Sequence, residues 1–192
     1  MASELFVDKI TGKTGTAGSA PLSMSGNTLT ATLGTSSTGF GLTTHVDQWN
    51  VESDTTTEGI ITNVGQVGTD SFSQIGTAMT ESSGYFTFPT TGKWLITATA
   101  SFKSTSGAIT YAAIYMNITT NNGTYTTRTF GPANIYGTNY YGVSYCNYMF
   151  DVSNTTTHKM YFYYARPSTS VTLMGSTSQN QSTFTFIRLG DT

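Results

Sequence analysis

Charged residues are scarce in this chain of 192 residues. Lys and Arg together number 8 and Asp and Glu number 10, so charged side chains make up 9% of the sequence, against roughly 25% in a typical soluble domain. The formal net charge is -2, and no cluster of basic residues occurs. Because phosphate neutralisation supplies most of the affinity for nucleic acids, this composition argues against a nucleic-acid-binding protein.

Cysteine is almost absent. Cys146 is the only one, so no disulfide within the chain is possible. It lies in an alternating apolar pattern, which predicts a buried, unreactive thiol.

The first residues, MASELFVDKITGKTG, lack the basic start and apolar core of a secretory signal. No run approaches the length of about 18 apolar residues that a membrane span needs. We therefore expect neither secretion nor membrane insertion.

Catalytic and metal-binding patterns are also lacking. The two histidines, His45 and His158, have no metal-ligand spacing, and His158, beside Lys159, is expected at a solvated strand edge. The only local group of acids is Glu52, Asp54 and Glu58. These three could collect Ca²⁺, which takes oxygen ligands, but a solvated acidic loop is favoured because no glycine-turned ligand loop accompanies them. The sequence thus predicts no enzyme, no cofactor and no metal.

Strand-forming residues are abundant. Thr and Ser are the commonest residue types, 13% of residues are aromatic and 37% are hydrophobic, which favours strands and argues against a fully disordered chain. In KWLITATASFK the apolar side chains alternate with hydroxyls. Similar patterns predict strands at 45–51, 60–67, 85–88, 111–118, 125–130, 145–152, 158–165, 171–174 and 183–189. No helical period exceeds one turn, so we predict an all-β fold, a sandwich or barrel-like jelly roll.

Residues 1–44 differ in composition from residues 45–192, which we interpret as the folded head domain. The N-terminal segment has one concentrated apolar group, formed by Leu5, Phe6, Val7 and Ile10, followed by Gly, Ser, Thr and Ala. Too few apolar side chains are present to offset the entropy of ordering. We therefore predict an extended docking arm in which these four residues contact another protein. The alternation over 28–33 predicts a single strand that needs a partner from outside the chain.

The strand at 159–165 is apolar on both faces. Met160, Phe162 and Tyr164 point one way, while Tyr161 and Tyr163 point the other. A sandwich strand usually has one wet face, so we predict that Tyr161 and Tyr163 lie in an interface between subunits. The alternative is that these rings lie on the surface with their hydroxyls in water.

One local motif carries a family resemblance. Gly84, Phe86, Pro89, Gly92 and Trp94 have the spacing G-x-F-x-x-P-x-x-G-x-aromatic. Physically this predicts two strands joined by a Pro/Gly corner. The motif resembles that of the complement globular-head domains, which share the tumour-necrosis-factor-like (TNF-like) jelly roll. The resemblance spans residues 45–191 and implies a ten-strand β-sandwich that assembles as a homotrimer. The segment 182–189 resembles the closing strand of that family, except that Phe186 stands where the family commonly has Gly.

The arm and the composition resemble the virion-anchoring N-termini of tailed-phage appendage proteins. This resemblance implies a non-enzymatic fibre protein of the virion, assembled in the host cytoplasm, that contacts other virion proteins through its arm. A host-surface glycan is a candidate partner, bound by the turns at 120–125 and 134–142, unless these are ordinary hairpin turns. The alternatives are a capsid decoration or fibre protein without a receptor role, a polysaccharide-degrading appendage, and a secreted cellular ligand of the same fold.

Overall fold

The computed structural model describes residues 22–25, 28–31, 43–67 and 74–192. The chain divides into two compact units, Met1–Gly41 and Leu42–Thr192. The described residues contain strands and no helix, and so no helix among them is long and apolar enough to cross a membrane.

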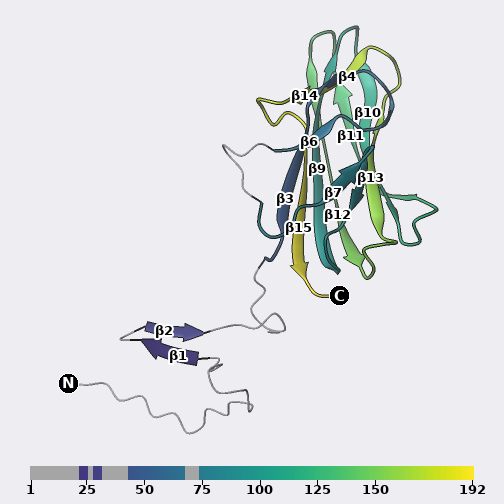
Figure 1. Cartoon of the computed structure of the whole chain (residues 1–192). Coiled ribbons are helices and arrows are strands. Elements are labelled where there is room, and N and C mark those ends of the chain that lie inside the picture. Colours follow the sequence, from purple (N-terminus) through teal and green to yellow (C-terminus); the bar gives the residue numbers. More distant parts are fainter. Residues whose placement is uncertain (1–21, 26–27, 32–42, 68–73) are drawn as a thin grey trace. The chain divides into compact units, whose positions relative to one another are not determined.

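The unit Leu42–Thr192 is built from two antiparallel sheets (Figure 1). The six-stranded sheet runs in the order β11-β10-β13-β8-β7, and β5 also pairs with β13. Its strands are β5 (Gly59–Ile60), β7 (Thr80–Ser82), β8 (Tyr85–Thr87), β10 (Ile109–Thr119), β11 (Thr126–Ile135) and β13 (Lys159–Ala165).

The seven-stranded sheet runs in the order β4-β14-β9-β15-β3-β6, and β12 pairs with the other edge of β9. Its strands are β3 (Val46–Val51), β4 (Ser53–Thr55), β6 (Val64–Gln66), β9 (Gly92–Ser104), β12 (Tyr141–Val152), β14 (Val171–Ser176) and β15 (Thr183–Gly190). The strand β9 is the centre of this sheet, since it pairs with β12, β14 and β15.

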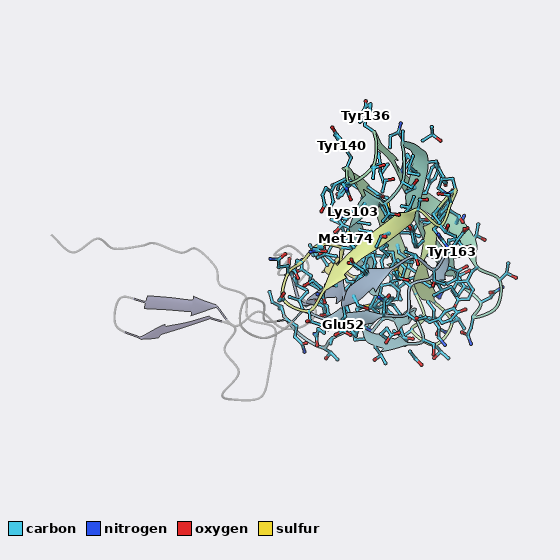
Figure 2. The ribbon with its side chains drawn as sticks, turned by 90° about the horizontal axis from the view of Figure 1, so that it is seen from above. Glu52, Lys103, Tyr136, Tyr140, Tyr163 and Met174 are labelled. Carbon is cyan, nitrogen blue, oxygen red and sulfur yellow. The ribbon has the colours of Figure 1, made fainter. Side chains whose placement is uncertain are left out.

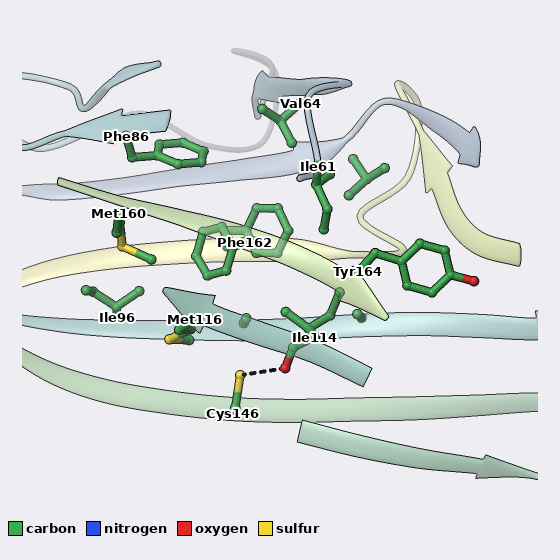
Figure 3. Packing of buried hydrophobic residues seen from close by; sticks show 14 of the residues in the cluster. Ile61, Val64, Phe86, Ile96, Ile114, Met116, Cys146, Met160, Phe162 and Tyr164 are labelled. Atoms are coloured by element: carbon green, nitrogen blue, oxygen red, sulfur yellow. Dashed lines mark hydrogen bonds between the residues drawn. The ribbon is translucent and has the colours of Figure 1, made fainter. Parts of the chain in front are cut away.

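Aromatic and aliphatic side chains from both sheets fill the space between them (Figure 3). Along β9, Trp94, Ile96 and Phe102 are fully buried, whereas the intervening hydroxyl side chains face outward. Phe102 stacks on Tyr164 of the opposite sheet with ring centroids 5.5 Å apart. Burial of such a side chain contributes roughly 1.5–3 kcal/mol. The alternation in the sequence therefore produces a two-layer β-sandwich, as predicted.

The predicted strands are present, with one division. The stretch predicted as a strand at 60–67 forms β5 and β6, because Ile60 pairs with β13 in one sheet and Val64 pairs with β3 in the other. The chain crosses between the layers here, so no continuous strand is possible. Two short strands, β4 and β7, carry no clear alternation and were not predicted.

The strand predicted at 28–33 pairs within the chain, so the prediction of a single strand without a partner in this chain is wrong. The strand β2 (Thr28–Ala31) pairs antiparallel with β1 (Leu22–Ser25), with Leu22 opposite Ala31 and Ser25 opposite Thr28. The pairing with β1 satisfies one edge of β2 from within the chain. The predicted docking residues Leu5, Phe6, Val7 and Ile10 lie outside the described residues.

His158 corrects a second prediction, because it is buried rather than at a solvated edge. Its ring stacks on Phe150 at 5.5 Å. The two ring nitrogens lie within hydrogen-bond distance of the hydroxyls of Ser153, at 3.3 Å, and Thr157, at 3.0 Å. The polar neighbours in the sequence therefore hold the imidazole inside the fold.

Cys146 is buried as predicted, with its thiol 3.9 Å from the carbonyl oxygen of Ile114 (Figure 3).

Candidate binding surfaces

The Pro/Gly motif forms a structural corner of the sandwich. Phe86 and Trp94 are fully buried, and the indole nitrogen of Trp94 donates a hydrogen bond to the carbonyl of Thr90 at 3.3 Å. Gly92 has a φ of +142°, and a Cβ at this position would lie 2.5 Å from the carbonyl oxygen of Gly190. Pro89 is half-buried at the bend before β9. These residues hold the corner and leave no side chain free to bind a ligand.

Gly84 lies in the two-residue turn between β7 and β8. Its φ is +86° and that of Ser83 is +53°, as a type I′ hairpin turn requires. A Cβ on Gly84 would lie 2.5 Å from Ile60. Phe186, which departs from the family pattern, is fully buried and packs on Phe86 with ring centroids 5.1 Å apart. The larger residue therefore fills the core between the motif and the last strand.

Within the described residues, no three His, Cys, Asp or Glu side chains come together in a way that could hold a metal ion. The acids of the predicted loop point to different partners. Asp54 accepts a hydrogen bond from the backbone of Gly175 at 2.9 Å, whereas Glu58 accepts one from the hydroxyl of Tyr163 at 3.3 Å. Glu52 lies over Gly65. The first two contacts lie on different sheets, so the local acidic group in the sequence is not a cluster in space.

A buried carboxylate escaped the sequence analysis. Asp47 is only 2% exposed and accepts four hydrogen bonds, from the backbone of Gln48 and Met79 and from the side chains of Trp49 and Gln66, at 2.7–3.0 Å. Such a fully satisfied acid ties β3 to β6 and to residue 79. Its role is structural, and no pattern in the sequence distinguishes it from the exposed acids.

Tyrosines form a groove on the outer face of the six-stranded sheet. Two cross-strand rows create it: Tyr163 lies opposite Tyr115, and Tyr161 lies opposite Asn117. The groove has a volume of 380 Å³. Its lining side chains are Glu58, Tyr115, Asn117, Thr127, Tyr161, Tyr163 and Ala165. Residues from 58 to 165 therefore meet in one place that no local motif indicates.

The rings of this tyrosine groove are held by their neighbours. Tyr161 packs on Tyr125 and Tyr85, with ring centroids 4.9 and 5.4 Å apart. Tyr115 stacks on Phe130 at 5.1 Å. Burial raises the pKa of Tyr161 and Tyr163, and the carboxylate of Glu58 raises the pKa of Tyr163 further. Both hydroxyls are therefore neutral donors at ordinary pH.

A second apolar surface lies on the outer face of the seven-stranded sheet. On β12, the outward side chains of Tyr141, Val143, Tyr145 and Met149 are 58–61% exposed. Strand pairing extends this stripe across the sheet, because Met149 lies opposite Leu95, Leu95 opposite Ile187, and Ile187 opposite Val46. We use the name apolar face for the six residues Met149, Leu95, Ile187, Val46, Val143 and Tyr145. Few charges lie nearby. Lys93 and Asp151, two residues beyond Leu95 and Met149 on the same two strands, form an ion pair with 2.8 Å between Nζ and Oδ2.

The two turns predicted to face a ligand are mostly closed by their own hydrogen bonds. In 120–125, the side-chain oxygen of Asn121 accepts from the backbone of Gly123 and Thr124 at 3.0 and 3.1 Å, as in an ordinary Asx turn. In 134–142, the backbone N–H of Tyr140 donates to the carbonyl of Gly137 at 3.2 Å, and the hydroxyl of Thr138 also accepts from the backbone of Gly107 at 2.8 Å. Tyr136 is 89% exposed at this end of the domain, near Tyr140 (Figure 2).

Comparison with solved structures identifies the fold. Murine APRIL aligns with a TM-score of 0.53 and 12% identity, covering 76% of this chain and 98% of APRIL. The TNF protein Eiger from S. frugiperda aligns with a TM-score of 0.55 and 10% identity, covering 77% of this chain and 93% of Eiger. No family model and no curated protein matches the sequence. The domain is thus a TNF-like jelly roll, as the motif resemblance implied.

Proposed function

We propose that this chain is a non-enzymatic structural protein of a tailed-phage virion, in which residues 1–44 attach a homotrimeric TNF-like head that contacts the host surface. The composition supports this proposal, because the chain stays polar through hydroxyls and amides with only 9% charged residues. The resemblance of the arm to virion-anchoring N-termini supports the location.

The observation that carries the assembly is the apolar face of the seven-stranded sheet. Large side chains at Val143, Tyr145 and Met149 are more than half exposed, and the strand register aligns Met149 with Leu95 and Ile187. Several large apolar side chains exposed on one face of a sheet usually mark an interface. A second copy of the chain is the occupant we assign to it, since the TNF-like resemblance implies a homotrimer.

Tyr161 and Tyr163 are the other candidate for the interface, and they were the one that the sequence favoured. Both are half-buried within their own chain, because Tyr85, Tyr125 and Glu58 already contact them. Less surface is left for a neighbouring subunit to cover. We therefore place the contacts between subunits on the apolar face.

Labelling of intact particles tests the virion role. Antibodies against the head, imaged by electron microscopy on particles of the phage that encodes the chain, should mark one defined place. Labelling on tail fibres or the tail tip would agree with host attachment, and labelling over the capsid would select the decoration role instead. Particles that lack the chain altogether would overturn the proposal.

A further inference from the structure

We propose that the tyrosine groove between β13, β10 and β11 is a saccharide site that takes a neutral pyranose unit of a glycan. The inference rests on the proposed attachment role, and it gives that role a ligand class and a place on the molecule. The site lies on the six-stranded sheet. Tyr125, from the 120–125 turn, packs against its Tyr161, whereas no residue of the 134–142 turn lines it. In Figure 2, Tyr163 lies at the surface of the domain, clear of Tyr136 and Tyr140.

The groove combines flat apolar surface with hydrogen-bonding groups. Tyr161, Tyr163 and Tyr115 supply ring faces, on which the C–H face of a pyranose can stack. Polar groups lie between these rings: the Glu58 carboxylate accepts two or more hydrogen bonds, and the tyrosine hydroxyls can donate or accept. A volume of 380 Å³ falls within the range of about 300–1,000 Å³ typical of small-molecule sites.

Asn117 supplies the polar floor of the groove. It is only 8% exposed, and its side-chain oxygen accepts a hydrogen bond from the hydroxyl of Thr127 at 2.7 Å. Its amide nitrogen makes no hydrogen bond with a described residue, so it is available to donate to a sugar hydroxyl. A donor and a carboxylate acceptor, placed beside aromatic rings, match the alternating donor and acceptor character of sugar hydroxyls.

The groove is organised before any ligand binds. The hydroxyl of Tyr163 donates to Glu58, the hydroxyls of Tyr111 and Tyr115 are paired, and Tyr161 is held between two other rings. A ligand therefore does not have to immobilise these side chains, which lowers the entropic cost of binding.

The charge of the groove selects the class of saccharide. Among the residues that the structure describes, Glu58 is the only acid or base other than tyrosine that lines the groove, and no Lys or Arg does. A phosphate, a uronic acid or a sialic acid would place its negative charge beside this carboxylate without a cation to compensate. A metal ion would have only one carboxylate ligand in the groove. A neutral sugar is not repelled by the carboxylate and does not need several charged ligands.

The experiment uses the full-length chain and a panel of neutral gluco-, manno- and galacto-oligosaccharides, with oligogalacturonate as the acidic probe. Binding is screened on a glycan array and then titrated by calorimetry. We expect at least one neutral oligosaccharide to bind and oligogalacturonate not to bind. Glu58→Gln and Tyr161→Ala should each weaken binding at least tenfold. The matched control Tyr136→Ala, at an exposed tyrosine outside the groove, should stay within twofold of the parent chain.

Tyr163→Phe keeps the ring but removes the hydroxyl that contacts Glu58, so it tests the site without a large change in packing. It should weaken binding severalfold with an unchanged melting temperature. The inference is overturned if no neutral oligosaccharide binds, if oligogalacturonate binds better, or if Glu58→Gln and Tyr161→Ala leave binding intact. It is also overturned if Tyr161→Ala lowers the oligomeric mass, because the groove would then be an interface between copies.

The outcomes separate this inference from the proposed function. A chain that is found on particles but binds no saccharide leaves the virion role standing and removes the groove as a sugar site. A chain that binds saccharide through Glu58 and Tyr161, but is absent from particles, does the reverse.

Discussion

Phe162 of β13 and Phe184 of β15 stack face to face across the two sheets, with ring centroids 3.8 Å apart and an angle of 8° between the rings. Both side chains are fully buried. Phe162 belongs to the strand that carries the tyrosine groove, and Phe184 to the strand that carries part of the apolar face. The pair therefore joins the layers that present the two candidate surfaces.

Truncation of this pair should destabilise the whole domain. Phe184→Ala leaves a cavity opposite Phe162 and should lower the free energy of unfolding by about 3–5 kcal/mol. Thr183→Ala, at the neighbouring outward position on β15, is the matched control and should cost about 1 kcal/mol or less. Urea denaturation followed by tryptophan fluorescence measures both. Equal effects of the two substitutions would show that the stacked pair does not hold the layers together.

The oligomeric mass should depend on the apolar face. Met149→Asp places a carboxylate among Leu95 and Ile187, where association would bury it without a partner, so the trimer mass of the parent chain should fall to that of a monomer. Tyr163→Asp, on the opposite sheet, should leave the mass unchanged. Light scattering at micromolar concentration measures both. The reverse pattern would place the interface at Tyr161 and Tyr163, and a monomeric parent chain would remove the homotrimer from the proposal.

The sequence predicted the strands but not the apolar face or the tyrosine groove, because both surfaces depend on how distant strands pair. Local alternation predicted the strands well, because burial of one face follows from a period of two. The row from Met149 through Leu95 and Ile187 to Val46 exists only after four strands from distant parts of the chain take one register. Glu58 likewise reaches Tyr163 only because β5 pairs with β13. Neither relationship has a local signature.

The burial of individual polar residues was not predictable from the sequence either. Asp47 and His158 are both buried, yet Asp47 alternates with Val46 as an outward polar residue would, and His158 stands between Thr157 and Lys159. Their hydrogen-bond partners at Gln66 and Ser153 lie in other elements or turns, and composition alone cannot show that a polar side chain will be satisfied inside the fold. The Gly84–Trp94 motif was visible because its turn and its core rings lie close together in the sequence.

The arm should be dispensable for folding and required for attachment. The unit Leu42–Thr192 is compact and contains the whole described core, so a chain that begins at Gly41 should keep the melting temperature and the oligomeric mass of the full-length protein. It should fail to join particles. Phe6→Asp in the full-length chain should also fail to join, because it places a charge in the predicted docking group. If the shortened chain appears on particles at the normal copy number, the head makes the virion contact and the arm does not.

Stability should decline at alkaline pH in part because of Cys146. Burial raises the pKa of its thiol from the ordinary 9.0 to about 11, and burial likewise raises the pKa of Tyr164, whose hydroxyl donates to the carbonyl of Val171 at 2.9 Å. Both groups are neutral in the folded chain, whereas the unfolded chain releases their protons at lower pH. For the thiol, the stabilising contribution is therefore complete below pH 9.0 and is lost as the pH rises toward about 11.

The urea midpoint, measured from about pH 7.5 to about pH 10.5, should fall across this window. Cys146→Ala removes the thiol and should give a shallower decline, while Tyr164 still contributes in both chains. An unchanged slope in the variant would show that the thiol titrates no differently in the folded and unfolded chains.

A thiol reagent gives an independent measurement, since Cys146 is only 4% exposed and the native chain should be labelled slowly. Rapid labelling would mean that β12 opens readily at Cys146, and burial could then not hold the pKa of the thiol up.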